Sequence, residues 1–203
     1  MQILSTMDNY NTLIQQVAIY LKSQKFKKKS STFYLIESDN LGLINFQKSN
    51  SSTTSKVLFT INLGISSSTI RAFESEDVTQ IPSVWDCHWQ KRIGQLLQKN
   101  DFWWTIDEYT SLDNLLSEII NIVSRIAIPN LKNRLSDDAL IKMWVEAYDS
   151  QTIKSVDFFN LLILLKIHNK ENLQIMVEQF KIFHSVQKME PTAKRLLKRL
   201  GFE

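Results

Sequence analysis

The sequence predicts an α+β protein: an N-terminal helix on an antiparallel β-meander with further helices, followed by an all-helical C-terminal part. Two patterns lead to this prediction. Residues 43–48 and 57–65 alternate between apolar and polar with the period of two that is typical of half-buried strands, and residues 32–37 are aromatic and β-branched. From Ser136 onward, the apolar residues recur at the spacing of helices instead. Short connections between consecutive strands favour antiparallel pairing, with one apolar face against the first helix.

The length of the chain bounds its domain organisation. A chain of 203 residues suits one large domain, or one domain with an extension. We therefore predict an α+β domain over residues 1–130 and a helical extension over residues 131–203 that packs on it.

The first helix is expected from about Ser5 to Gln24. Ser5 and Asp8 have the spacing of a capping box, in which each side chain bonds the main chain of the other residue. The apolar positions of this segment are three or four residues apart and share one helix face: Met7, Tyr10, Ile14, Val17, Ala18 and Leu21.

Three strands are expected next, over residues 32–37, 43–48 and 57–65. Ser38-Asp39-Asn40 predicts a turn between the first two, and the polar residues 49–55 predict a loop. Alternation is clearest in the third strand, where one face carries Val57, Phe59, Ile61 and Leu63 and the other carries Thr60, Asn62 and Gly64. A fourth strand is a candidate over residues 102–106.

Helices are expected over most of the remaining chain. Residues 66–83 read as an irregular loop, after which Pro82 and Ser83 introduce a helix over 84–98. A strongly amphipathic helix is predicted over 111–128, with a capping box of Thr110 and Asp113 and with Pro129 ending or bending it. Beyond Ser136 the predicted helices begin near residues 136, 155, 172 and 191, and the second of these is apolar almost all round and should be buried.

Composition argues against several classes of protein. The chain has one cysteine, Cys87, so no intramolecular disulfide can form, which suits a reducing compartment. The N-terminal residues lack the pattern of a signal peptide, and the longest apolar run is too short to span a bilayer. We therefore expect a cytoplasmic protein with no membrane span.

Catalytic and metal-binding patterns are not found in the sequence. Cys87 and His88 are adjacent and would project about 100° apart on a helix, so they do not form a nucleophile–base pair with each other. Cys87 would need His168 or His184 from elsewhere in the fold. The three histidines show no metal-ligand spacing, and no nucleotide-binding or nucleophile-elbow motif is present. We expect no catalytic residues, no metal and no cofactor.

The candidate binding residues are Asn45, Gln47, Asn62, His88 and Arg92. On the predicted helix 84–98, His88 and Arg92 would share a polar stripe, and the three amides lie on one face of adjacent predicted strands. Mid-strand amides are unfavourable unless something compensates for them. Two interpretations stay open: either the helix packs across the amides and Arg92 bonds them, or the set lines an open patch that receives a partner.

Two basic segments offer an alternative interaction surface. One is Lys22–Lys29, with five lysines in eight residues, and the other is the predicted C-terminal helix with Lys194, Arg195, Lys198 and Arg199. Either could contact phosphates or an acidic partner, or form a solvated surface. The formal net charge is only +3, so nucleic-acid binding does not follow from composition.

Four segments carry a resemblance to a known family: INFQKS (44–49), FTINLGI (59–65), CHWQKRIG (87–94) and FWW (102–104). In content, order and spacing they resemble the bacterial family catalogued as domain of unknown function 4304, over about residues 8–130. The family name implies no activity. Its members are similar to small proteins found near bacterial toxin and defence loci.

From these observations we expect a non-enzymatic protein-interaction module, in the form of an immunity-like inhibitor of a bacterial toxin. An inhibitor of a nuclease should be strongly acidic, so the net charge of +3 points to a toxin that is not a nuclease. The alternatives are a nucleic-acid-associated protein that uses Lys22–Lys29 and the basic C-terminal helix, and an enzyme with an unrecognised site near His88 and Arg92.

Overall fold

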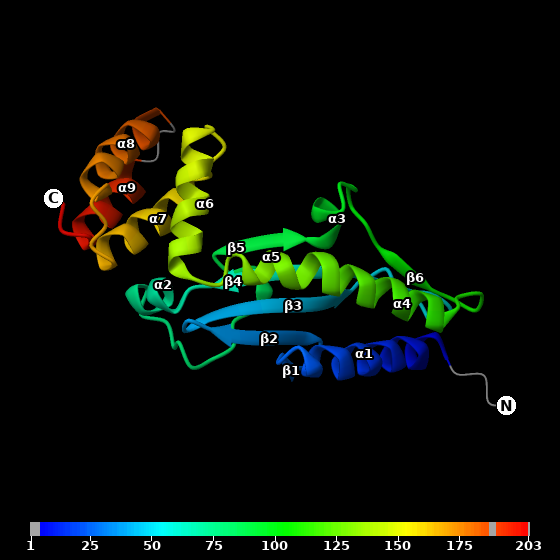
Figure 1. Cartoon of the computed structure of the whole chain (residues 1–203). Helices are drawn as coiled ribbons and strands as arrows, with labels where there is room; N and C mark the ends of the chain where they lie inside the picture. Colours follow the sequence, from blue (N-terminus) through cyan, green and yellow to red (C-terminus); the bar gives the residue numbers. More distant parts are fainter. Residues whose placement is uncertain (1–4, 187–189, 203) are drawn as a thin grey trace. The chain divides into compact units, whose positions relative to one another are not determined.

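The chain divides into two compact units in the computed structural model, which describes residues 5–186 and 190–202 (Figure 1). The first unit is Met1–Ser66 with Ile81–Leu135, and the second is Ser67–Gln80 with Ser136–Glu203. We expected the helical extension to begin at residue 131. The second unit contains the chain from Ser136 onward together with the internal segment Ser67–Gln80.

The first unit is built on an antiparallel sheet, as predicted. Its strands in the described ranges follow the order β1-β2-β3-β4-β5, and β6 also pairs with β4. β5 pairs with residues Asn62–Ile65 of β4, and β6 pairs with residues Val57–Phe59 of β4. The two strands β5 and β6 therefore share one edge of β4. The strands are β1 (Lys27–Lys29), β2 (Thr32–Glu37), β3 (Asn40–Lys48), β4 (Val57–Ser66), β5 (Trp89–Arg92) and β6 (Trp104–Ile106).

Helices run along one side of this sheet (Figure 1). The N-terminal one is α1 (Thr6–Ser23), and its predicted capping box of Ser5 and Asp8 is present. A longer helical run begins at α4 (Leu112–Ile122), continues as a π-helical segment, η2 (Val123–Ala127), and ends with α5 (Ile128–Lys132). Two short segments complete the unit: a 3-10 turn, η1 (Val84–Asp86), and α3 (Ile93–Leu96).

The helix-side face of the sheet is the core of the first unit. Val57, Phe59, Ile61 and Leu63 are fully buried, which confirms the predicted apolar face of this strand. The Tyr10 ring of α1 lies 5.4 Å from the Phe59 ring, centroid to centroid. On the other side of Phe59, Trp104 of β6 stacks at 5.5 Å. The first helix therefore covers this face, as expected.

The predicted helix over residues 84–98 is wrong. This segment is a 3-10 turn, the strand β5 and the four-residue helix α3. The prediction followed from apolar residues at steps of three and four. The observed burial alternates instead: Cys87 and Trp89 are buried, whereas His88 and Gln90 are more exposed. Pairing with the free edge of β4 satisfies main-chain groups that an isolated helix would bond within itself, and this tertiary contact decides the conformation.

The hairpins at the basic end of the sheet differ from the sequence prediction in their bounds. Lys27–Lys29 forms an edge strand, where a helix end and turn had been expected. Between β2 and β3, Ser38 and Asp39 both have positive φ (51° and 64°) and form a two-residue turn. β3 therefore begins at Asn40, three residues before the predicted start.

Three further expectations are corrected. Residues 66–83 are not wholly irregular, because Ser66 ends β4 and Ser67 caps a helix, α2 (Ser68–Phe73). The helical run from Leu112 does not stop at Pro129, which occupies the first turn of α5, where a missing N–H is tolerated. Thr110 bonds Asp107 in place of forming a capping box with Asp113.

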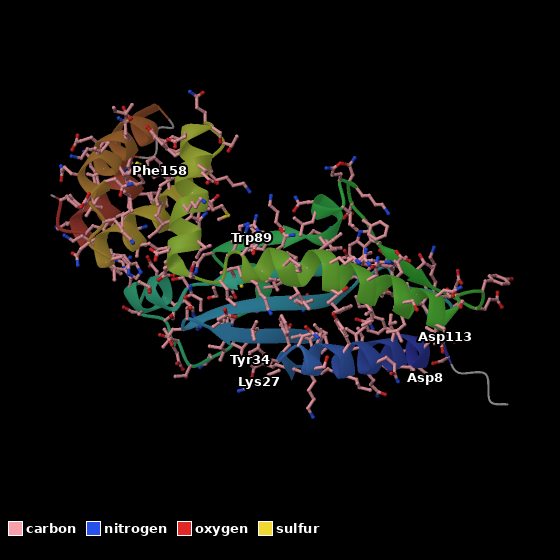
Figure 2. All side chains as sticks on the ribbon, in the orientation of Figure 1. Asp8, Lys27, Tyr34, Trp89, Asp113 and Phe158 are labelled. Carbon is pink, nitrogen blue, oxygen red and sulfur yellow. The ribbon has the colours of Figure 1, made fainter. Side chains whose placement is uncertain are left out.

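The described part of the second unit is helical, as predicted. It contains α2 with α6 (Asp137–Asp149), α7 (Ser155–Ile167), α8 (Leu173–Val186) and α9 (Glu190–Arg199). α7 is apolar on all sides and is the buried centre of the unit, with its Phe158 ring 5.1 Å from Phe180 (Figure 2). No helix in the described ranges is long and apolar enough to cross a membrane.

Gly94→Ala is expected to destabilise the first unit. An added Cβ would lie 2.5 Å from the main-chain oxygen of Asn100 and 2.9 Å from Cβ of Phe102, so the following loop must move. Overpacking of this kind typically costs about 1–3 kcal/mol. The measurement is urea unfolding followed by tryptophan fluorescence, because four of the five tryptophans lie in this unit.

Gly42→Ala is the matched control. Its added Cβ would meet only side-chain atoms, the nearest being Cδ1 of Leu135 at 3.1 Å, so the loss should be smaller. A Gly94→Ala variant as stable as the wild type would contradict this account of the loop.

Candidate functional site

The face of the sheet opposite the helices is apolar at one end. Leu41, Leu43 and Cys87 form a buried cluster there, with Tyr34 and Ile81 packed against it. The cover is tight, because a Cβ on Gly64 would lie 2.6 Å from Sγ of Cys87. This half of the face is therefore closed by the chain from Ile81 to Cys87.

The other end of the same face is covered by the loop between α3 and β6. The buried Thr60 hydroxyl donates to the main-chain oxygen of Phe102 at 2.9 Å. In this loop Lys99 lies over the Phe102 ring, 4.3 Å from its centroid. Polar side chains occupy the face between the two covering segments.

These polar side chains form one line across the sheet. Register pairs Lys29 with Thr32, Thr32 with Asn45, Asn45 with Asn62, and Asn62 with Arg92. Residues directly opposite one another project from the same face. We call these five residues, one from each of β1 to β5, the polar row. Four strand spacings give it a length of about 19 Å.

Side-chain hydrogen bonds join members of the polar row in two separate groups. Nδ2 of Asn45 donates to Oγ1 of Thr32 at 2.9 Å. Nε of Arg92 donates to Oδ1 of Asn62 at 3.4 Å, and Nδ2 of Asn62 donates to Oε1 of Gln47 at 2.9 Å. Gln47 thus joins the row from the neighbouring position on β3.

The arginine at the end of the row is held from three sides. Besides Asn62, its guanidinium pairs with the Asp101 carboxylate and lies over the Trp103 ring, 5.2 Å from the centroid. The pKa of Asp101 lies below its usual value. The larger cause is the hydrogen bond from the Trp103 side chain, and the smaller one is the Arg92 guanidinium. Arg92 stays 30% exposed, whereas Asn62 is 3% exposed.

The structure brings together four of the five residues singled out from the sequence. Hydrogen bonds link Gln47, Asn62 and Arg92, and Asn45 lies opposite Asn62 in the strand register. His88 belongs to the apolar end of the face, four residues before Arg92 on the β5 side, which is about 13 Å along a strand. The shared helical stripe of His88 and Arg92 does not exist, because Arg92 ends the strand β5 and His88 lies in a bend directly before it.

Sequence reasoning left four residues out of this site: Lys29, which it assigned to the separate basic segment Lys22–Lys29, and Thr32, Asp101 and Trp103. The first two enter through strand register, and a β1 strand was not expected. Asp101 directly precedes the FWW segment (102–104) and Trp103 lies within it, but the sequence predicts only a strand there. No local pattern singles out Thr32, because residues 32–37 (TFYLIE) do not alternate between polar and apolar.

Cys87 and His168, the described side chains considered for catalysis, each make hydrogen bonds within their own unit. Cys87 packs on Gly64, and its thiol donates to the main-chain oxygen of Ser83 at 3.6 Å. His168 belongs to the second unit, where it pairs with Asp137 at 2.8 Å. The side chain of His184 lies outside the described residues. In the described part of the chain, no group of three or more His, Cys, Asp or Glu side chains is arranged to hold a metal ion.

Arg92→Ala should lower the free energy of unfolding by about 1–2 kcal/mol, because buried Asn62 loses a charge-assisted donor. The pKa of Asp101 should rise toward its usual value and still remain below it, since the Trp103 hydrogen bond is retained. Urea unfolding and an NMR titration of the Asp101 carboxyl measure the two effects. Lys56→Ala, on an exposed loop, is the control. Equal unfolding free energies for Arg92→Ala and wild type would show that the arginine does not support the row.

Comparison with known proteins agrees with the family expected from the four motifs. No curated protein and no solved structure matches the chain. The family model described as a domain of unknown function (DUF4304) matches residues 17–133, which is more than half of the chain and covers every strand of the sheet. This chain therefore belongs to the DUF4304 family.

Proposed function

We propose that this chain is a non-enzymatic protein-interaction module that binds a partner protein through the polar row and Gln47. The observation that supports this proposal is the row itself: a line of polar side chains, one from each of five strands, crosses the face of the sheet that the helices leave uncovered. Asn45, Gln47 and Arg92 are partly exposed, so a partner can reach them.

The orientation of the amides supports a protein ligand. Arginine only donates hydrogen bonds, so Asn62 must present its oxygen to Arg92 and its nitrogen to Gln47. The side-chain oxygen of Gln47 accepts the hydrogen bond from Asn62, so the side-chain nitrogen of Gln47 is available to donate to a partner. Asn45 uses its nitrogen on Thr32 and has its oxygen available as an acceptor. A polypeptide main chain carries both donors and acceptors, whereas phosphates at neutral pH mainly accept.

Nucleic acid binding is the alternative, and the basic segments bear on it. Lys22–Lys29 belongs to the first unit and α9 to the second. The first unit has thirteen basic and nine acidic residues, a net charge of +4, and the second unit has a net charge of −1. A nucleic-acid surface usually has a larger basic excess on one domain. The charge distribution therefore favours a protein partner.

A finer form of the proposal is an immunity-like role, in which the partner is a bacterial toxin that is not a nuclease. The net charge of +3 supports a toxin that is not a nuclease. An inhibitor of a nuclease has to complement a basic, nucleic-acid-binding surface and should therefore be acidic. The single cysteine, a buried free thiol, is consistent with action in the reducing cytoplasm. The proposed binding mode requires no cofactor.

A photo-cross-linking residue at Gln47 should capture a discrete protein partner in the native cell. The same residue at Ile19, exposed on α1, is the control and should not capture it. With that protein purified, Asn45→Ala should weaken binding about 5- to 10-fold, the loss of one to two hydrogen bonds, while the melting temperature falls only slightly through the lost bond to Thr32. Adducts that nuclease removes, or equal capture from both positions, would reject the proposal.

The immunity-like role makes a separate prediction. Expression of the captured partner alone should arrest growth, and coexpression of this chain should restore it. Coexpression of the Asn45→Ala variant should restore growth less well at equal protein levels. A partner whose expression leaves growth unchanged would reject the immunity-like role while leaving the binding role intact.

A further inference from the structure

The edge strand β1 consists of three consecutive exposed lysines. Lys27 and Lys29 pair with Tyr34 and Thr32 and project from the same face as the polar row, of which Lys29 is the first member. Lys28 projects from the helix-side face, where its Nζ lies 5.8 Å from the Phe33 ring centroid. Figure 2 shows Lys27 and Tyr34 close together at this end of the sheet.

The charge of this strand is not compensated within the described residues. Lys22, Lys25 and the three β1 lysines form no ion pair there. Nζ of Lys29 donates to the neutral main-chain oxygen of Ile81 at 3.4 Å, which leaves its charge unpaired within the described residues. A cluster of this kind attracts a negatively charged partner surface.

The outer edge of β1 is also open for pairing. β1 ends the strand order, and in the described residues its main-chain hydrogen bonds run to β2 alone. Exposed edge strands accept an extended peptide as an additional strand, through main-chain hydrogen bonds. Side chains of the added strand lie directly opposite the lysines.

We infer that β1 receives an extended acidic segment of the partner protein by strand addition. This inference rests on the proposed function and names the chemistry of the partner at one end of the polar row. Acidic side chains at alternate positions of the segment would face Lys27 and Lys29, which are about 7 Å apart along the strand.

The same lysines explain why the edge selects such a partner. Lysines on an edge strand oppose pairing with a second copy of the chain, because like charges would lie opposite each other. They oppose any other basic strand in the same way, whereas a neutral strand is neither repelled nor attracted by their charge. An acidic strand converts this repulsion into cross-strand attraction, so the edge discriminates by charge.

The test is an NMR titration of the full chain with the capped hexapeptide Glu-Thr-Glu-Thr-Glu-Thr. Saturable shifts are expected at the main-chain amides of Lys27–Lys29, and the peptide Lys-Thr-Lys-Thr-Lys-Thr should produce none. The variant with Lys27→Glu and Lys29→Glu should bind the acidic peptide at least 10-fold more weakly. Lys56→Glu makes the same kind of change at an exposed loop and should bind like the wild type. Far-ultraviolet circular dichroism establishes that both variants fold.

Other outcomes would overturn the inference. Equal binding by the double variant, or shifts spread evenly over all exposed lysines, would show a nonspecific charge effect. Tighter binding of a ten-residue oligothymidylate to the same amides would assign the edge to nucleic acid. If the captured partner binds the double variant normally but loses affinity for Asn45→Ala, the inference fails and the proposed function stands. If neither variant affects that partner, the proposed function fails as well.

Discussion

The register between β3 and β4 is the constraint on which the first unit depends. It pairs eight positions, from Leu41 with Ser66 to Lys48 with Phe59. The same register that places Phe46 opposite Ile61 in the core places Asn45 opposite Asn62 on the other face. Because side chains alternate, a slip of one residue would exchange these two sets.

The energetic difference between the two registers is large. Full burial of each large apolar side chain contributes about 1.5–3 kcal/mol, and an amide without a partner in the core costs a comparable amount. Phe46 and Ile61 are almost fully buried in the observed register, and Asn62 has partners on both sides. The core thereby determines the arrangement of the polar row.

The sharing of one β4 edge by β5 and β6 explains the environment of Arg92. The chain pairs with one part of the β4 edge up to Arg92 and with another part of it from Trp104. Between these two residues it passes through α3 and a loop that lies over the face opposite the helices. That loop brings Asp101 and Trp103 to the guanidinium. Gly94 permits the loop to lie close, because its Cα approaches the main chain of Asn100. The polar row thus ends at a fixed cation.

The second unit is held by its own polar contacts. Asp137 begins α6 and accepts hydrogen bonds from Ser67 at 2.7 Å and Thr69 at 2.6 Å, while its other contact is His168 at the end of α7. Arg71, 4% exposed, pairs with Glu76 and donates to main-chain oxygens of the segment that follows α2. These bonds attach the internal segment Ser67–Gln80 to helices that come much later in the sequence.

The sequence by itself determined the elements whose pattern is local. Alternation in residues 57–65 identified β4 and its buried face, and the capping box at Ser5 identified the start of α1. The all-round apolar segment at residues 158–167 identified the buried helix of the second unit. In each case the signal is a pattern within one helix or strand, formed by residues that are close together in the sequence.

Tertiary structure alone decided the conformation of residues 84–98 and the assembly of the site. The spacing of Trp85, Trp89 and Ile93 fits a helix, and the segment is extended because β4 offers an unpaired edge. Asn45, Gln47, Asn62 and Arg92 were identifiable from the sequence as unusual polar residues. Their alignment with Lys29 and Thr32 depends on register across five strands, which no local pattern in the sequence encodes.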